Sequence, residues 1–315
     1  MFNSYDMKAF GHELKELRSK CNLSQKTVSL MSKVSEDTLR RIENGYVVPR
    51  YDTIVILSAL YRTNLLDMLN RLGINSTLFN YYEIMDTAMI SNDLELLADS
   101  YNDLATLLSS NMSSQNLVYY DELKQILVFF ELIQYFYEDP GKYTDKIMNS
   151  ILAIFQERYP EYTIQNYAAY HYSFVELRLL LLFCLVYSNY DIKHCNEICL
   201  FMYDLLNSDT PDHHTYKILI KIIYKISYNY YTMEDDEMCI KYADIGITMA
   251  NANNSSYLLA DLLIRKGIAL NYLHHPDAYK YIKYSIDLLA MTGQVSKSEE
   301  YKKITENVHH IKLDK

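Results

Sequence analysis

Two adjacent arginines, Arg40 and Arg41, are the side chains in this sequence whose type and position best suit recognition of a ligand. An arginine guanidinium offers a fixed fork of donors, which matches the two acceptors on the major-groove edge of guanine and also pairs with phosphate. We expect Arg41 to contact base edges and Arg40 to contact phosphate, which positions a protein on DNA but carries no sequence information. The other residues that could contact DNA from the same segment are Gln25, Ser35, Glu36, Asp37, Thr38, Asn44, Tyr46 and Arg50. For each of these residues the alternative interpretation is a solvated surface side chain.

The segment between Leu14 and Leu69 contains the caps and breaks that would hold these side chains on a helix. Ser24 and Ser35 are suitable N-caps, because a serine hydroxyl can accept a hydrogen bond from an unpaired amide one turn further on. Asn44-Gly45 suits a helix end, since glycine adopts the left-handed conformation freely, and Pro49 prevents an immediate restart. This order of helix, break, helix, tight turn and helix is typical of helix-turn-helix domains, whose reading helix enters the major groove of DNA.

Apolar residues at helical spacing predict the core of this domain. The residues expected to face inward are Phe10, Leu14, Leu17 and Cys21 on the first helix, Val28 and Met31 on the second, Leu39 and Ile42 on the third, Ile54, Leu57 and Leu60 on the fourth, and Leu65, Leu66 and Leu69 on a short fifth. We therefore expect a five-helix DNA-binding domain over residues 1–70.

Residues 8–69 resemble the phage-repressor (Xre/Cro-type) family of helix-turn-helix domains in their spacing, caps and polar positions. The resemblance implies a structural ion pair between Arg18 and Glu43, and it implies that Gln25 contacts a phosphate. The sequence departs from the family at the turn, where Ser32-Lys33 replaces an apolar residue followed by glycine. A residue other than glycine in the left-handed conformation costs about 1 kcal/mol, so this turn is expected to be strained.

Charge is divided unevenly along the 315 residues, whose formal net charge is −10. Residues 1–70 contain 10 basic and 8 acidic residues, whereas residues 71–315 contain 20 basic and 32 acidic residues. An acidic body is repelled by DNA phosphate, so we expect DNA contact to be confined to the N-terminal domain. The acidic body could attract a basic partner, but solubility is the preferred explanation of its charge.

The five cysteines show no spacing typical of a disulfide framework, which favours free thiols in a reducing cytoplasm. Cys195 and Cys199 are four residues apart and could face one another on a helix, but without a nearby ligand pair we interpret them as packing residues. The three adjacent histidine pairs do not suggest a metal site, because neighbouring side chains on a helix point about 100° apart. We therefore predict no metal ligands. The cysteines are Cys21, Cys184, Cys195, Cys199 and Cys239.

The sequence contains no phosphate-binding glycine loop, dinucleotide fingerprint or nucleophile elbow. With 7 glycines and 5 prolines it also offers few of the tight loops from which enzyme sites are built, so we expect neither an enzyme nor a cofactor. The N-terminus lacks the charged start and apolar run of a signal peptide. The longest apolar stretch, Leu177–Tyr187, is too short to span a bilayer.

From about Leu78 onward, apolar residues recur at helical spacing, and short polar breaks separate helices of about 15–22 residues. Asn189-Tyr190, Asn229-Tyr230 and Asn271-Tyr272 each close a long apolar helix, at intervals of about 40 residues. This period resembles that of tetratricopeptide-type (TPR) repeats with longer helices, and it predicts a TPR-like α-solenoid over residues 71–315. The small residues expected where helices cross closely are Ala243, Gly246, Gly267 and Ala278.

An α-solenoid exposes a concave face that can hold an extended peptide. The residues that we expect on this face are Arg178, Asn189, Lys225, Asn229, Arg265 and Asn271. The asparagines could hydrogen-bond a peptide backbone, but an alternative is that they end helices, since asparagine tolerates the left-handed conformation. Solvated helix edges would explain the three basic residues equally well.

The combination of a phage-repressor-type domain with a helical repeat body resembles the RRNPP family, the group that includes Rgg, PlcR and PrgX. The resemblance covers the whole chain in architecture and residues 8–69 in motif. It implies a cytoplasmic, dimeric transcription regulator of the quorum-sensing type. In such a regulator the repeat domain captures a short signalling peptide that alters the hold of the homodimer on double-stranded DNA with an inverted repeat. The alternative is a repeat domain that binds a protein partner, such as an anti-repressor or scaffold.

Overall fold

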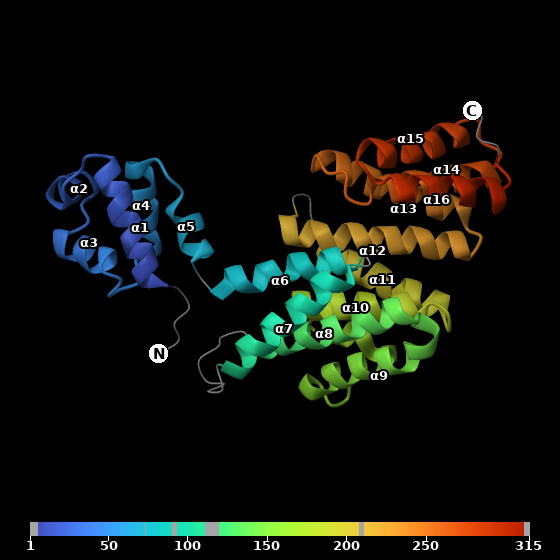
Figure 1. The fold of residues 1–315 in the computed structure, drawn as a ribbon, viewed down its shortest axis with the longest axis horizontal. Coiled ribbons are helices and arrows are strands. Elements are labelled where there is room, and N and C mark those ends of the chain that lie inside the picture. Colours follow the sequence, from blue (N-terminus) through green and yellow to red (C-terminus); the bar gives the residue numbers. More distant parts are fainter. Residues whose placement is uncertain (1–5, 73, 90–92, 111–119, 208–210, 312–315) are drawn as a thin grey trace. The chain divides into compact units, whose positions relative to one another are not determined.

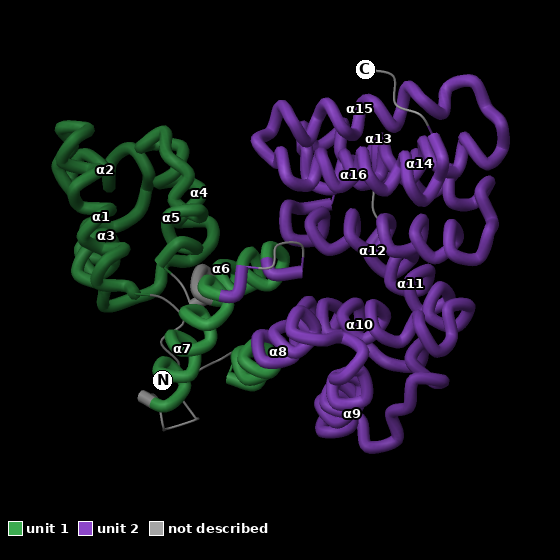
Figure 2. Tube along the Cα trace, turned by 45° about the vertical axis from the view of Figure 1, so that its right-hand side comes forward, with its two compact units in different colours: residues 1–87, 95–128 green, residues 88–94, 129–315 purple. Residues whose placement is uncertain are grey.

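The computed structural model describes residues 6–72, 74–89, 93–110, 120–207 and 211–311 (Figure 1). Within these ranges the chain is helical and contains no β-strand, which confirms the all-α fold class. None of the helices in these ranges has the length and apolar character needed to cross a membrane. The chain divides into two compact units, coloured separately in Figure 2: residues 1–87 with 95–128, and residues 88–94 with 129–315.

The first unit begins with the five helices predicted from the sequence. They are α1 (Met7–Lys20), α2 (Gln25–Ser32), α3 (Glu36–Glu43), α4 (Tyr51–Tyr61) and α5 (Leu65–Arg71). The Ser24 hydroxyl accepts a hydrogen bond from the Thr27 amide at 3.0 Å. The Ser35 hydroxyl accepts from the Thr38 amide at 3.1 Å, so both serines are the N-caps that the sequence predicts. The buried core of these helices includes Phe10, Leu14, Val28, Leu39, Ile42, Ile54, Leu57 and Leu65.

Three residues expected in this core, Cys21, Met31 and Leu66, lie at the surface, so the prediction is wrong for them. Cys21 follows the last residue of α1 and is its C-cap. In α2, Ser32 takes the inward position in place of Met31, whose side chain is 60% exposed. The Ser32 hydroxyl donates to the Val28 carbonyl at 2.7 Å and accepts from the Val34 amide at 3.1 Å. These two hydrogen bonds allow a polar side chain to be buried.

The first unit also includes most of α6 (Ile74–Ala88), together with α7 (Leu94–Ser110) and the first part of α8 (Tyr120–Glu138). The predicted domain boundary between residues 70 and 71 coincides with the end of α5, whereas the two compact units divide within α8. A predicted break at residues 111–116 lies outside the described residues.

The second unit is an array of helices that follow α8 along the chain. Its further α-helices are α9 (Pro140–Arg158), α10 (Phe174–Tyr187), α11 (Ile192–Leu206), α12 (His213–Thr232), α13 (Asp236–Ala252), α14 (Leu259–Tyr272), α15 (Ala278–Met291) and α16 (Val295–Asn307). Each helix from α9 to α15 packs against the next α-helix in the chain, and α12 also contacts α10 and α14. Contacts between successive neighbours are those of a helical-repeat array, which confirms the predicted solenoid.

Small residues allow helices of this array to cross closely, as predicted. A Cβ atom at Gly267 on α14 would lie 2.8 Å from the backbone nitrogen of Ile282 on α15, closer than two such atoms can approach. Ala243, Gly246 and Ala278 are also buried. The backbones of α14 and α15 therefore meet at a point where only glycine fits.

The three Asn-Tyr pairs lie at the C-terminal ends of α10, α12 and α14, as predicted, but not at strictly equivalent positions. Asn189 lies in the turn after α10, Asn229 lies in the last turn of α12, and Asn271 lies near the end of α14. A predicted short break at Tyr159–Tyr162 is the start of a longer connection that includes a 3₁₀ helix at Ile164–Ala169. The array is therefore less regular than a constant period of about 40 residues implies.

Candidate DNA interface and ligand pocket

The outer face of α3 carries most of the residues predicted to contact DNA. Leu39 and Ile42 are fully buried and Glu43 nearly so, and these three residues fix the inner face of the helix. The exposed residues begin at the N-cap and are Ser35, Glu36, Asp37, Thr38, Arg40 and Arg41, followed after the helix by Asn44, Tyr46 and Arg50. The inner face of α3 packs against the domain, so both arginines point outward. Such a helix is suited to lie in the major groove.

Two of the polar side chains on this face already have partners within the domain. The Arg40 guanidinium pairs with the carboxylate of Asp37, three residues earlier on α3. The side-chain amide of Asn44 donates to the Arg40 carbonyl at 2.8 Å. Among the residues that the structure describes, none pairs with the guanidinium of Arg41. Arg41 therefore keeps its whole donor fork available for a ligand.

An ion pair between Arg18 and Glu43 joins α1 to the end of α3. The Nε atom of Arg18 donates to Oε1 of Glu43 at 2.6 Å, Nη2 donates to Oε2 at 3.0 Å, and the glutamate side chain is 2% exposed. The hydrogen bond to Glu43 raises the pKa of Arg18, which keeps the guanidinium charged. Gln25 completes the arrangement, because its Nε2 atom donates to Oε2 of Glu43 at 2.8 Å. The side chain of Gln25, expected to contact phosphate, is thus engaged inside the domain.

Lys33 adopts the left-handed conformation at the end of α2, with a φ of 63°, in the turn that leads to α3. We expect Lys33→Gly to stabilise the domain by about 0.5–1 kcal/mol, because relief of left-handed strain outweighs the chain entropy that glycine loses on folding. Hydrogen exchange of the α2 amides measures the change. Lys26→Gly, inside α2, is the matched control and is expected to destabilise by up to about 1 kcal/mol. Faster exchange in the Lys33→Gly variant would contradict the presence of strain.

A cavity of about 210 Å³ lies in the second unit, where α10, α12, α14 and α16 supply most of its wall. Its lining residues are Met89, Leu181, Leu185, Lys221, Tyr224, Lys225, Leu258, Asp261 and Lys297. Alternate helices of a repeat array line one common face, which is the face that such arrays use for binding. A second hollow of about 410 Å³ along α13 offers a single charged side chain, that of Asp244.

The charges in the 210 Å³ pocket favour an anion. Asp261 is 7% exposed, and its carboxylate pairs with Nζ of Lys297 at 2.8 Å and accepts a hydrogen bond from the Tyr301 hydroxyl. Burial raises the pKa of Tyr301, so this hydroxyl remains a neutral donor. The pocket wall carries three lysines, Lys221, Lys225 and Lys297, and one carboxylate, that of Asp261, so its formal charge is positive. A carboxylate is the natural partner of such a pocket.

Two of the residues predicted to hold a peptide lie at or beside this pocket. Lys225 lines it, and Arg265 lies within electrostatic reach of Tyr224, another residue of its wall. Arg178, in contrast, is completely buried, and its Nη1 atom donates to the Phe174 carbonyl at 3.0 Å. The prediction that Arg178 lies on an open face is therefore wrong, because the interior of the helix array encloses its side chain.

The predicted asparagines do not line the pocket. Asn229 is completely buried, so its prediction as a residue of an open face is also wrong. Asn189 is exposed after α10, and Asn271 is half-buried near the end of α14. The sequence-based prediction missed Lys221, although Lys221 and Lys225 are four residues apart on α12 and therefore share one face. The four-residue spacing from Lys225 is the sequence feature from which Lys221 could have been predicted.

Comparison with known protein families defines the N-terminal part of the chain. Residues 9–72, which contain most of α1 and all of α2 to α5, match a family described as "Helix-turn-helix domain". These residues therefore form a helix-turn-helix domain, as predicted. No curated protein sequence matches the chain.

Solved structures share the fold of nearly the whole chain. PlcR from Bacillus thuringiensis, in complex with the peptide PapR7 and DNA, has a TM-score of 0.64 and 17% sequence identity, over 92% of this chain and 99% of PlcR. ComR from S. thermophilus, in complex with DNA and its signalling peptide ComS, has a TM-score of 0.59 and 14% identity, over 96% and 100%. A complex of PrgX with cCF10 has a TM-score of 0.55 and 15% identity, over 93% and 96%. The chain thus has the full-length fold of PlcR, ComR and PrgX, which confirms the resemblance to the RRNPP group at the level of the fold.

Proposed function

We propose that this chain is a transcription regulator of the RRNPP type, whose hold on DNA is gated by a short signalling peptide bound in the helical repeat domain. The observation that carries the proposal is the presence, in one chain, of an exposed reading helix that presents Arg41 and a positively charged pocket in the repeat array. PlcR and ComR, which share the fold, were each solved with a peptide and DNA. The proposed role is binding rather than catalysis, and it belongs in the cytoplasm, where the DNA is.

The proposed DNA-bound form is a homodimer. Two copies of α3 would then enter the major groove on one face of the duplex, about 34 Å apart, and the site would be an inverted repeat. Within each copy Arg41 is the proposed base reader and Arg40 the proposed phosphate contact. Ser35, Glu36, Asp37 and Thr38 would lie at the base edges, and Asn44, Tyr46 and Arg50 at the backbone.

The pocket sets the chemistry of the proposed peptide. Its volume of about 210 Å³ is below the roughly 300–1,000 Å³ of a site for a complete small molecule, so it suits one end or one side chain of a peptide. The ammonium groups of Lys221 and Lys225 suit a carboxylate there. The peptide changes DNA binding only if it binds one arrangement of the dimer more tightly than the other.

A gel-shift titration tests the DNA-reading half of the proposal, with the full chain and the DNA that flanks its own gene. We expect Arg41→Ala to weaken the specific complex by about 10- to 100-fold, which corresponds to loss of a bidentate contact with guanine. Arg41→Lys is the matched control: it keeps the charge but not the fork, so it should retain salt-dependent binding and lose sequence preference. If both variants kept the sequence specificity of the parent protein, Arg41 would not be a residue that reads base edges.

The same titration tests gating when the small-peptide fraction of spent culture medium is added. We expect the fraction to change the affinity for DNA, and we expect Lys225→Met to reduce this response about tenfold or more, because a charged hydrogen bond is lost. Lys241→Met, at an exposed lysine of α13, is the control and should respond normally. If the fraction did not change the affinity for DNA, the result would favour the alternative that the repeat domain binds a protein partner, such as an anti-repressor or scaffold.

A further inference from the structure

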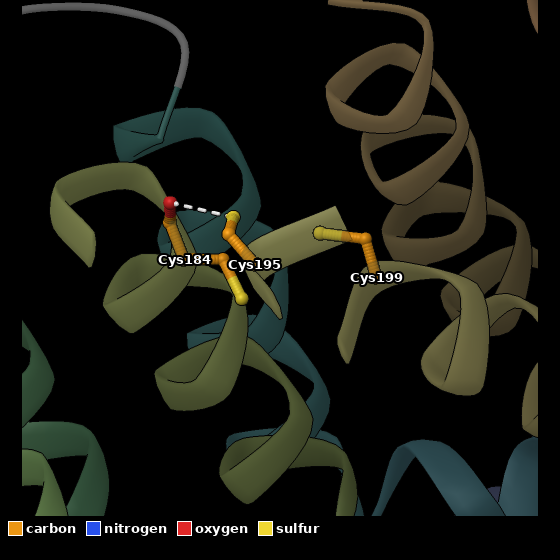
Figure 3. A group of neighbouring side chains, drawn as sticks. All are labelled: Cys184, Cys195 and Cys199. Carbon is orange, nitrogen blue, oxygen red and sulfur yellow. Dashed lines mark hydrogen bonds between the residues drawn. The ribbon is translucent and has the colours of Figure 1, made fainter. Parts of the chain in front are cut away.

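Three thiols from two helices converge in the interior of the second unit (Figure 3). Cys184 lies on α10, and Cys195 and Cys199 lie on α11. Their sulfur atoms all lie within 4.8 Å of one another, and all three side chains are completely buried. The sequence indicated packing roles for Cys195 and Cys199 because it did not show that Cys184 joins them.

The local fold explains why the three sulfurs meet. Only four residues separate the end of α10 at Tyr187 from the start of α11 at Ile192, so α11 folds back along α10. The spacing of four residues between Cys195 and Cys199 places both on one face of α11, and that face is turned toward Cys184. The sulfur of Cys195 lies 3.3 Å from the carbonyl oxygen of Cys184, which fixes the two helix ends together.

Two side chains of α12 complete the surroundings of the thiols. The Nδ2 atom of Asn229 lies 3.7 Å from the sulfur of Cys195 and donates toward it, while the buried Oδ1 atom of Asn229 has no hydrogen-bond partner among the residues that the structure describes. The ammonium of Lys225 lies close enough to the sulfur of Cys195 to act on it electrostatically. Burial raises the pKa of Cys184. A positive charge therefore stands close to the three thiols.

We propose that Cys184, Cys195 and Cys199 bind a soft, thiolate-preferring d¹⁰ metal ion in three-coordinate geometry. With metal–sulfur bonds of about 2.3 Å, three sulfurs around a trigonal centre lie about 4 Å apart, so only small movements are needed. Among the described residues, no histidine, aspartate, glutamate or further cysteine joins the group, and this argues against the four-coordinate site that zinc prefers. Thiolates select soft ions.

The charges balance when a divalent ion binds. Each thiol or thiolate forms one sulfur–metal bond, the protons still present are released to solvent, and three thiolates with one divalent ion carry a net charge of −1. The Lys225 ammonium offsets this charge, and Asn229 donates to the ligand sulfur of Cys195 and so orients it. The proposal does not depend on the function proposed above.

Titration of the full chain with cadmium chloride tests this site. The parent chain carries Cys21→Ser, which removes the exposed thiol and leaves the four buried ones. We expect one equivalent of Cd²⁺ to bind, with an ultraviolet thiolate-to-metal charge-transfer band, release of protons, and a rise in Tm. Excess zinc should not displace it. Each addition of cadmium is followed until the absorbance is constant, because metal binds at a buried site only as fast as the α10–α11 hairpin opens.

Single variants assign the ligands. Cys184→Ala, Cys195→Ala and Cys199→Ala should each weaken cadmium binding by more than about 100-fold, beyond the loss expected when a residue that only orients a ligand is removed. Cys239→Ala is the matched control, because Cys239 is also buried in the second unit but lies outside the cluster, and its cadmium affinity should be unchanged. Circular dichroism of the metal-free variants separates loss of a ligand from loss of the fold. Absence of the band in a folded parent, displacement by zinc, or equal losses in the control and cluster variants would overturn the proposal.

Discussion

Replacing Glu43 with alanine is expected to unfold most of the helix-turn-helix domain and to abolish its binding to DNA. The change removes the acceptor of the Arg18 guanidinium and of the Gln25 amide, and it leaves a charge that is 13% exposed without its partner. Breaking a buried ion pair from one side costs about 3–5 kcal/mol. A domain of about 60 residues has a total stability of about 3–9 kcal/mol, so this loss is comparable with all of it.

Two further variants make the effect of Glu43 specific. Glu36→Ala changes an exposed glutamate in the first turn of the same helix, and it is expected to cost no more than about 1 kcal/mol. The double variant Arg18→Met with Glu43→Leu removes both charges and should recover most of the loss, because no unpaired charge remains. Hydrogen exchange of α1 and α3 in the full chain gives the free energies of opening. If Glu43→Ala cost no more than Glu36→Ala, the ion pair would have no structural role.

The second large effect is expected at Gly267, where α14 and α15 touch. Its added Cβ in Gly267→Val would lie 2.6 Å from Cγ1 of Ile282 and 2.8 Å from the Ile282 nitrogen. A side chain could rotate away, but a backbone nitrogen moves only if the two helices separate. We expect a loss of about 3 kcal/mol in the free energy of unfolding of the helix array, at the upper end of the range for overpacking.

Urea denaturation of the full chain measures this loss, with Gly141→Val as the matched control. Gly141 lies in the first turn of α9, and the only atom near its added Cβ is Oδ1 of Asp139 at 3.4 Å, an ordinary contact. The control should change stability by no more than about 0.5 kcal/mol. Similar losses in both variants would show that the α14–α15 crossing does not require glycine.

Local features of the fold could be predicted from the sequence because they depend on a few neighbouring residues. The caps at Ser24 and Ser35 form hydrogen bonds only three residues along the chain, and the stop at Gly45 depends on one left-handed residue. The burial of Ser32 in place of its neighbour Met31 could not be predicted from the polarity of the two side chains. It depends on two hydrogen bonds that satisfy a buried hydroxyl.

The pocket was harder to predict, because its residues meet only after the helices are stacked. Lys225, Asp261 and Lys297 come from three different helices, and the last two are 36 residues apart in sequence yet form an ion pair. A sequence pattern gives the face of one helix but not the neighbour that covers it. For the same reason, Arg178 and Asn229 were assigned to an open face although both are enclosed by neighbouring helices.

The position of Lys225 has a consequence for the whole repeat array. Its side chain lines the wall of the 210 Å³ pocket and also acts electrostatically on the sulfur of Cys195. One ammonium group cannot fully neutralise two anions, so negative charge gained at either place weakens the attraction for negative charge at the other. Thermodynamic reciprocity makes this antagonism equal in both directions. A single turn of α12 thus couples the proposed metal site to the proposed peptide pocket.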